Sequence, residues 1–321
     1  MSTETPRELV GPSPAIARTR ELVRRAARQE GGIVLVGEEG VELEPIAREL
    51  HAGGRRADGQ FVAFDCRVDP ASADLELFGE TPGDLPRDLE PVSRDSAVAR
   101  ARGGTLYLAH ITDAPASTQT RLARLARDRE ARIDGDPTAT DVRLVAGAPV
   151  EIDDEVRAKR FRDDLFRRLS AARIDVPSLR DRAEDVPALA VRIAADFARA
   201  GGFQPKTFTD AALALLAALT WPGNLIELAT VVETAVRSTA SPTIHVEHVL
   251  PVLRLERAPA AFAPAGNLRD ARLRFERDYI AAVLQHHGWR VAAAAETLGI
   301  QRPNLYRKAR QLGISLTSTA E

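Results

Sequence analysis

The stretch IVLVGEEGVELE (residues 33–44) decides the fold around which the rest of the chain is arranged. Its four leading apolar residues, 33–36, predict a buried β-strand. The glycines Gly37 and Gly40 predict a tight turn, and a helix that runs on through Leu50 is expected to follow it. A turn of this kind points backbone N–H groups and the positive end of a helix toward a bound phosphate. The stretch therefore predicts a strand–loop–helix unit with the shape of an anion site.

The side chains in this frame differ from those that a phosphate needs. In the P-loop pattern GxxxxGK[ST], a lysine reaches the outer phosphates of a nucleotide. That position is Leu43 here, and the glycine expected before it is Glu42. The carboxylates of Glu42 and Glu44 come where a triphosphate needs positive charge. The predicted backbone thus resembles a nucleotide site, but the side chains lack the positive charge that a nucleotide needs.

The composition indicates a globular protein with a basic C-terminal part. The 321 residues suffice for two or three domains, and 44% apolar and 28% charged residues are ordinary values for a packed core. From residue 266 to the end, nine lysines and arginines stand against five acidic residues, whereas the rest of the chain has an acidic excess. This asymmetry predicts nucleic-acid contact at the C-terminus.

Cysteine usage and hydropathy point to the cytoplasm. The single cysteine, Cys66, excludes an intrachain disulfide and suits a reducing compartment, and we expect it to lie in the core. The first eight residues show no signal-peptide pattern, and the longest apolar run, 211–219, is too short to span a bilayer. The histidine pairs 245/248 and 286/287 have no partner at metal-ligand spacing, so no metal site is predicted.

The order of the predicted elements gives an α/β domain followed by helices. Apolar runs at 61–66, 105–111 and 142–147 alternate with helical patterns, which predicts a doubly wound parallel sheet. Around the sheet we further expect an amphipathic helix at 13–27 with Leu22 on its apolar side, a short helical turn at 74–78 and a helix at 118–129 with a basic outer face. The segment 81–94 is expected to be irregular and exposed. Helices at 184–200, 210–219 and 224–238 are expected to follow without intervening strands. The predicted domains are therefore an α/β domain (9–178), a helical lid (179–256), a linker (257–266) and a terminal helical module (267–316).

Seven near-verbatim stretches, in a fixed order, resemble the sigma-54-dependent transcriptional activators. They are VGEEG (36–40), FVAFDC (61–66), ELFG (76–79), GGTLYL (103–108), RFRDDLFRRL (160–169), EDVP (184–187) and WPGN (221–224). The family joins an AAA+ ATPase to a C-terminal Fis-type helix-turn-helix, and the resemblance extends from about Leu9 onward. It implies an AAA+-like P-loop domain with a parallel sheet, an all-α lid and an all-α DNA-binding domain. Many members carry an N-terminal sensory domain, for which this sequence leaves no room.

The resemblance also identifies where this chain departs from the family. In the nucleotide site, Gly37, Glu38 and Gly40 keep the turn while Leu43 replaces the lysine. The Asp-Glu pair that holds Mg²⁺ and polarises the attacking water corresponds to Ala109 and His110. An alanine cannot bind Mg²⁺, and a neutral imidazole is a poor ligand for a hard cation.

Three further positions of the family are lost. The polar sensor after the next strand corresponds to Pro149, and the sensor arginine after the WPGN turn corresponds to Ile226. The GAFTGA loop, which engages the sigma factor, corresponds to GDLPRD (83–88) and keeps only its first glycine. Together these losses remove the groups that position metal, phosphate and water, so we expect a pseudo-ATPase without a required cofactor. Weak ATP or ADP binding through the adenine pocket alone is left open.

Arg162 and Arg168 match the arginines that family subunits insert into a neighbour's ATP site. One interpretation is that they form structural ion pairs with Asp163, Asp164 or Asp175. The other is that this subunit lends Arg162 to an intact relative in a mixed ring. The first is preferred, because a surface arginine near several carboxylates is more often an ion-pair partner.

The C-terminal module predicts a DNA-binding helix-turn-helix. An apolar stripe at helical spacing over 267–287 predicts packing or a dimer seam, and helices are expected at 291–298 and 302–311 on either side of a turn at 299–300. The second helix has Pro303 in its first turn and places Leu305 and Ala309 on its inner side. Its outer side resembles a recognition helix, with base contacts expected from Arg302 and Asn304, phosphate contacts from Arg307, Lys308 and Arg310, and either backbone or core contacts from Tyr306.

The sequence thus predicts a DNA-binding transcriptional regulator whose AAA+-like module is an oligomerisation or partner platform. Its expected partners are double-stranded DNA, a second copy through the C-terminal domain, a higher oligomer through the AAA+-like domain, and RNA polymerase or an intact AAA+ relative. Two alternatives remain: a divergent activator that still binds nucleotide, and a regulatory subunit that tunes an intact relative through mixed rings.

Overall fold

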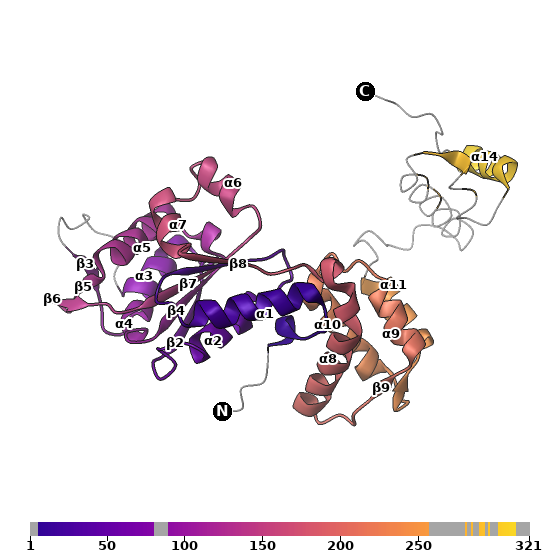
Figure 1. Cartoon of the computed structure of the whole chain (residues 1–321), viewed down its shortest axis with the longest axis horizontal. Helices are drawn as coiled ribbons and strands as arrows, with labels where there is room; N and C mark the ends of the chain where they lie inside the picture. The colour runs from indigo at the N-terminus through magenta and orange to yellow at the C-terminus, as the bar shows by residue number, and fades with distance from the viewer. Residues whose placement is uncertain are drawn as a thin grey trace. The chain divides into compact units, whose positions relative to one another are not determined.

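A computed structural model of the chain describes residues 6–79 and 89–256 and, in the C-terminal part, residues 280, 284, 289–292, 295 and 301–312. Residues 1–256 and 257–321 form two compact units (Figure 1), and each is described by itself. In the described part of the chain, none of the helices combines the length and the apolar character that crossing a membrane requires.

A parallel sheet forms the centre of the first unit. Its five strands lie in the order β2-β4-β7-β1-β8, and all pairs are parallel. The strands are β1 (Ile33–Val36), β2 (Phe61–Asp65), β4 (Thr105–Ala109), β7 (Arg143–Ala148) and β8 (Ala172–Asp175). Parallel sheets need both faces covered, and all four residues of β1 are buried. The predicted α/β domain with a parallel sheet is confirmed.

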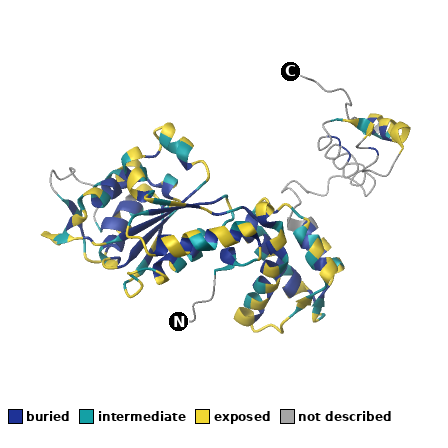
Figure 2. Cartoon of the chain, in the orientation of Figure 1, coloured by how far each residue is buried: buried dark blue, intermediate teal, exposed yellow. Residues whose placement is uncertain are grey.

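Alternate strand residues build two separate cores, because successive side chains of a strand point to opposite faces. Ile33 and Leu35 pack with helices α1 (Pro14–Ala27) and α2 (Leu43–Ala52) on one face of the sheet. Val34 and Val36 pack on the other face with α3 (Pro70–Phe78), α4 (Ala97–Arg100), α5 (Ala116–Asp128) and α7 (Asp163–Leu169). Cys66 lies fully buried in this second core, as predicted. Figure 2 shows the buried strands between the half-exposed helices.

The helices around the sheet agree with the prediction in part. They are α1 (Pro14–Ala27), α2 (Leu43–Ala52), α3 (Pro70–Phe78), α4 (Ala97–Arg100), α5 (Ala116–Asp128), α6 (Ile152–Arg157) and α7 (Asp163–Leu169), with 3-10 turns at Arg7–Leu9, Ile111–Asp113 and Leu179–Asp185. Helices α1, α2 and α5 lie within two residues of the expected bounds, α3 begins four residues earlier than expected, and α4, α6 and α7 were not predicted. The Ser13 hydroxyl caps α1 by accepting the N–H of Ile16 at 3.1 Å. The expectation that Leu22 faces the core is wrong, since Thr19 and Val23 are buried there and Leu22 is 44% exposed.

A second small sheet replaces the irregular exposed segment expected before residue 94. Strands β3 (Glu90–Val92), β5 (Glu130–Ile133) and β6 (Asp136–Ala139) lie in the order β3-β5-β6, and β5 and β6 form an antiparallel hairpin. The hairpin turn has Asp134 and Gly135 at φ 51° and 98°, as a two-residue Asp-Gly turn requires. Residues 80–88, which include the predicted counterpart of the GAFTGA loop at 83–88, lie outside the described part.

The basic outer face predicted for residues 118–129 is wrong at one position. Arg121 of α5 is 2% exposed, and its guanidinium donates to the buried Glu90 carboxylate at 2.5 Å and lies 4.0 Å from the Phe78 ring. A charge can be buried here because a carboxylate from a distant strand pairs with it.

The lid follows the sheet domain and has its own core. Helices α8 (Val186–Gly201), α9 (Asp210–Ala217), α10 (Asn224–Ser238) and α11 (Val246–Glu256) pack around the fully buried Trp221. Its indole N–H donates to the carbonyl of Leu216 at 2.9 Å. The lid is predominantly α-helical as predicted, with one addition: β9 (Thr207–Phe208) pairs in parallel with β10 (Thr243–Ile244).

The second unit contains the predicted second helix of the C-terminal module. Helix α14 spans Arg302–Gln311, as expected, with a proline in its first turn. Leu305 and Ala309 are fully buried, and Leu305 packs with Ile280, Leu284 and Ala295. The predicted linker (257–266), most of the apolar stripe over 267–287 and most of the 291–298 helix lie outside the described residues.

Candidate functional site

The phosphate loop, residues 37–42, lies where the sheet topology favours a ligand. It leaves the carboxyl end of β1, whose connection runs to β2 at one edge of the sheet. The connection from the neighbouring strand β7 runs to β8 at the other edge, so the two leave in opposite directions. Ligands of open α/β sheets bind at such a switch point. The Gly37 N–H donates to the Ala148 carbonyl at 3.2 Å, which fixes the start of the loop.

The WPGN turn of the lid packs directly on the phosphate loop. Gly40 has φ +82°, and a Cβ there would come within 2.0 Å of the Gly223 carbonyl oxygen, so only glycine fits. The Ile226 N–H donates to the Gly40 carbonyl at 3.2 Å, and the Asn224 amide donates to the Glu39 carbonyl at 2.8 Å. The loop is therefore clamped between the sheet and the lid.

The side chains around this clamp do not provide free positive charge. The Ile226 side chain, at the position predicted for a sensor arginine, is 55% exposed and apolar. Arg180 does reach the loop, but its guanidinium is held in an ion pair with Glu38, with one hydrogen bond of 2.8 Å. The glutamate thus neutralises the arginine that a phosphate would need.

Leu43 fills the place of the lysine with apolar surface. It is the first residue of α2 and packs against the core that contains Tyr107 and Ile46. Its methyl carbons lie 3.1 Å and 3.4 Å from where an added Cβ would stand on Gly37 and Gly147, so the side chain lies over the glycine turn. No charged head can extend from here toward an outer phosphate.

A carboxylate of the chain itself accepts a hydrogen bond from one N–H group of the loop. The Glu42 N–H, at the N-terminus of α2, donates to the Glu8 carboxylate at 2.9 Å. Glu8 is fully buried and paired with Arg182, which also donates to the Glu8 carbonyl at 2.6 Å. Burial raises the pKa of Glu8, and Arg182 and the Glu42 N–H offset this only in part. One N–H group at the helix N-terminus that would face a phosphate is therefore bound internally.

The carboxyl end of β4 carries Ala109 and His110 in place of acidic residues. Ala109 is half-buried beside Asp65 of β2. His110 is exposed and has the left-handed conformation at φ 51°. Asp65 is itself bound by Arg67 at 2.7 Å, and this hydrogen bonding lowers the pKa of the carboxyl. Pro149 follows β7 and is half-buried, without a side-chain donor or acceptor.

The residues of this site do not fit a Mg²⁺–ATP complex. The lysine position is packed apolar surface, the metal-ligand position is a methyl group, and one N–H donor of the loop is engaged by Glu8. Within the described residues, no cluster of three or more acidic, histidine or cysteine side chains has the geometry of a metal site. The structure thus brings Gly37, Gly40, Leu43 and Ile226 together at one loop.

The two candidate trans-acting arginines have different surroundings. Arg162 forms a bidentate ion pair with Asp164, at 3.0 Å and 2.8 Å, and also donates to the Thr120 hydroxyl at 3.3 Å. Arg168 of α7 is exposed, and among the described residues its guanidinium has no hydrogen bond or ion pair. The pKa of the Asp128 carboxyl is lowered mainly by a hydrogen bond from Arg127, and the charge of Arg168 contributes to this lowering. The structural ion pair thus applies to Arg162 alone.

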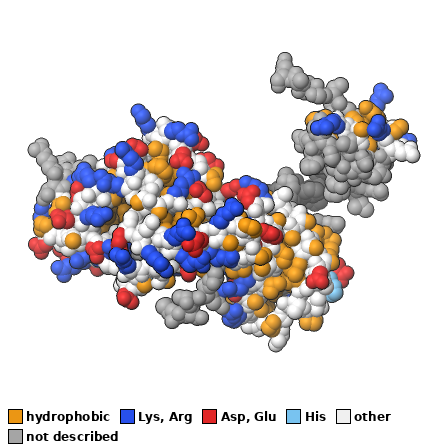
Figure 3. Space-filling view, in the orientation of Figure 1, with side chains coloured by type: hydrophobic (Ala, Val, Ile, Leu, Met, Phe, Trp, Pro, Cys, Tyr) orange, Lys and Arg blue, Asp and Glu red, His pale blue; other side chains and the backbone are white. Residues whose placement is uncertain are grey.

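Helix α14 presents its polar residues outward. Arg302, Asn304, Tyr306, Arg307 and Arg310 are exposed and Lys308 is half-exposed, opposite the buried Leu305 and Ala309. Tyr306 is 53% exposed, so it does not belong to the core. The Arg307 guanidinium donates to the Asn304 side chain at 3.3 Å. Lys and Arg side chains project from this helix in the space-filling view (Figure 3).

Three family descriptions match successive parts of the chain. Residues 9–175 match the Sigma-54 interaction domain, 180–263 match the AAA+ ATPase lid domain, and 272–312 match the bacterial regulatory protein Fis family. The first match alone covers more than half of the 321 residues. The chain belongs to the sigma-54-dependent regulator family. It carries the family's AAA+ fold, its lid and its Fis-type helix-turn-helix.

Individual relatives agree with this assignment. The alginate biosynthesis transcriptional regulatory protein AlgB of Pseudomonas putida is 34% identical over 305 residues, which cover 94% of this chain and 66% of AlgB. The nitrogen assimilation regulatory protein NtrX of Azorhizobium caulinodans is 33% identical over 323 residues, covering 96% of this chain and 70% of NtrX. The chain thus spans about two thirds of the length of the curated relatives it matches.

A solved structure supports the fold. The crystal structure of NtrX from Brucella abortus in complex with ATP superposes with a TM-score of 0.68 at 31% identity, over 95% of this chain and 69% of that one. That relative binds ATP. This family member has different site residues at the positions described above.

Sequence reasoning missed the internal partners of the phosphate loop. Glu8 and Arg182 are 174 residues apart, and no local pattern links them. The Glu38–Arg180 pair likewise joins segments 142 residues apart. A signal was present for the carboxylates, since acidic residues at a predicted anion site need cations nearby. That these cations are Arg180 and Arg182 became clear only from the position of the lid in the structure.

Proposed function

We propose that this family member is a DNA-binding transcriptional regulator whose AAA+ module does not hydrolyse ATP and serves as a platform for self-association or partner binding. The family assignment and the exposed basic face of α14 support the regulatory part. The phosphate loop supports the loss of hydrolysis. The proposal includes a cytoplasmic location and a dimer through the C-terminal domain.

One observation carries the proposal for the AAA+ module. The Glu42 N–H, which a phosphate oxygen would accept in a working loop, is bound by the buried Glu8 carboxylate at 2.9 Å. A phosphate would have to displace this carboxylate and lie beside Glu38, Glu42 and Glu44 without the lysine. Transition-state stabilisation by each such positioned charge typically contributes a few kcal/mol, so their joint absence is decisive for the rate.

The test compares the full chain with its Leu43→Lys variant. We expect background phosphate release and no saturable ATP binding for both, because the variant restores one charge among several acidic neighbours and leaves Ala109 and His110 in place. Phosphate release and calorimetric ATP titration in Mg²⁺ measure this, with an intact family member as the positive control. Hydrolysis that scales with the concentration of the unmodified chain would show a divergent working activator instead.

For α14 we propose base contacts from Arg302 and Asn304 and phosphate contacts from Arg307, Lys308 and Arg310. Residues at the start of a recognition helix are the ones that reach base edges in helix-turn-helix proteins. The loss of the GAFTGA residues at 83–88 makes remodelling of the sigma-54 holoenzyme unexpected. We therefore expect the chain to regulate transcription either as a repressor or through another form of RNA polymerase.

A second candidate function is that of a regulatory subunit in rings with an intact relative. It is favoured by the exposed Arg168 guanidinium, which no described residue pairs. Mixing the chain with an intact family member should then change the ATPase rate of that relative, and Arg168→Ala should abolish the change while Arg157→Ala should not. An unchanged ATPase rate on mixing would exclude this function.

A further inference from the structure

A cavity lies at the end of the sheet opposite the phosphate loop. It has a volume of about 320 Å³ and is lined by residues that precede β1 and β7, by the last turn of α5 and by α7. Glu30 and Gly32 come before β1, and Val142 and Leu144 lie at the start of β7, so the cavity is at the amino ends of two neighbouring strands. The phosphate loop follows the carboxyl end of β1, roughly 13 Å of strand away.

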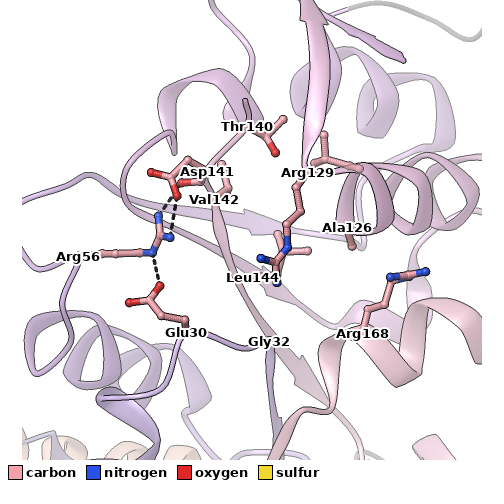
Figure 4. A pocket seen from close by; sticks show the side chains of 11 residues that line it. Glu30, Gly32, Arg56, Ala126, Arg129, Thr140, Asp141, Val142, Leu144 and Arg168 are labelled. Carbon is pink, nitrogen blue, oxygen red and sulfur yellow. Dashed lines mark hydrogen bonds and ion pairs between the residues drawn. The ribbon is translucent and has the colours of Figure 1, made fainter. Parts of the chain in front are cut away.

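Three arginines approach this cavity, and their partners differ. Arg56 binds the Glu30 carboxylate at 3.0 Å and the Asp141 carboxylate at 2.7 Å, so it is fully committed. Figure 4 shows Arg129 reaching into the middle of the cavity, with Arg56 on one side and Arg168 on the other. Among the described residues, neither the Arg129 nor the Arg168 guanidinium has a hydrogen bond or an ion pair.

The lining therefore carries a net positive charge that its own carboxylates leave uncompensated. Three guanidiniums face two carboxylates, and both carboxylates are already bound by Arg56. A guanidinium presents its N–H donors as a fork that matches the oxygens of a phosphate or carboxylate. Arg129 is exposed to solvent and offers such a fork in the middle of the cavity.

The remaining lining is apolar and small. Leu125, Ala126, Val142 and Leu144 form apolar walls, and the buried Thr140 adds a hydroxyl. Pockets for small molecules have volumes of about 300 to 1,000 Å³, so this cavity is at the lower end of their range. A nucleoside triphosphate is larger than such a space favours. An anionic group at Arg129 with a compact apolar body against the walls fits both features.

We propose that this cavity binds a small organic anion, whose phosphate or carboxylate group is held by Arg129 and Arg168 and whose apolar body packs on Leu144 and Ala126. The site is separate from the phosphate loop and is independent of the proposed loss of ATP hydrolysis. Because α7 and the α5–β5 corner border it, the ligand would join two elements on one side of the sheet.

The experiment titrates the full chain with phenyl phosphate and benzoate as probes, with benzyl alcohol as the neutral analogue. We expect saturable binding of at least one anion and none of the alcohol. Arg129→Gln should weaken it about tenfold, equivalent to about 1.4 kcal/mol. Arg132→Gln is the matched control, since Arg132 lies on β5 three residues after Arg129, donates to the Gly135 carbonyl and does not line the cavity.

A second variant separates the cavity from simple surface charge. Ala126→Leu keeps every charge but fills part of the hollow, and it should also weaken binding while the thermal midpoint of unfolding stays close to that of the unmodified chain. Preference for phenyl phosphate over benzoate, or the reverse, identifies the anionic group. The proposal is overturned if neither anion binds saturably, if the alcohol binds equally, or if Arg129→Gln and Arg132→Gln have equal effects.

Discussion

At the scale of single residues, the buried pair of Glu8 and Arg182 ties three segments together. Their side chains are 0% and 1% exposed, and Glu8 also receives the N–H of Glu42 from the phosphate loop. The neighbouring Asp185 carboxylate accepts from the N–H and the hydroxyl of Ser13, both at 2.7 Å. A buried charge that loses its partner costs far more than an exposed one, so the lid, the first helix and the loop depend on these contacts.

Replacing Arg182 by alanine should therefore destabilise the chain strongly, by about 3–5 kcal/mol, because it leaves a buried carboxylate without its cation. The pKa of Glu8 is already raised above its ordinary 4.5 by burial and should rise further. A carboxyl with a raised pKa in the folded state binds its proton more tightly than in the unfolded state. The stability it provides is complete below pH 4.5 and is lost as the pH rises through the folded pKa.

The loss caused by Arg182→Ala should consequently be smaller at pH 5 than at pH 7.5. Urea denaturation at the two pH values measures it. Arg25→Ala, which removes an exposed ion pair with Glu21, is the control and should change stability little at either pH. An equal loss at both pH values would mean that Glu8 does not take up a proton when its partner is removed.

At the scale of elements, the predictable parts were those with a local signal. The four strands read from apolar runs are present within two residues at each end, because the strands of a covered parallel sheet are mostly apolar. Helix α14 was predicted with its bounds, since its proline marks its first turn and its two inward residues mark its buried face. The Asp-Gly turn at 134–135 was an available signal for the β5–β6 hairpin and was missed.

Other elements depended on contacts between distant residues. The proline at 251 lies inside α11 and breaks the usual sequence pattern of a helix, so this helix was not predicted. From the sequence, Arg121 is expected to be an exposed cation on α5. Its burial is favourable only because Glu90 of β3 pairs with it. In the candidate site, the substitutions at Leu43 and Ala109 were visible in the sequence, whereas the cavity around Arg129 was not.

At the scale of the whole molecule, the two compact units separate the proposed tasks. The altered nucleotide site and the lid belong to residues 1–256, and the basic helix α14 belongs to residues 257–321. A regulator built in this way does not need ATP hydrolysis for its DNA contact, because the helix has its own buried core of Leu284, Ala295 and Leu305. DNA affinity should therefore be the same with and without ATP and Mg²⁺.

The contact itself should be electrostatic at Arg307. Arg307→Ala should weaken binding to the chain's own genomic sites, recovered by mapping of bound DNA, and to random duplex alike, since a phosphate contact carries no sequence information. The slope of log affinity against log salt should fall in magnitude by roughly 0.9, as expected for one phosphate contact fewer. Arg157→Ala, an exposed cation of the first unit paired with Asp154, is the matched control and should leave both quantities unchanged. A slope that stays constant in Arg307→Ala, or a loss restricted to the genomic sites, would instead assign Arg307 to a base edge.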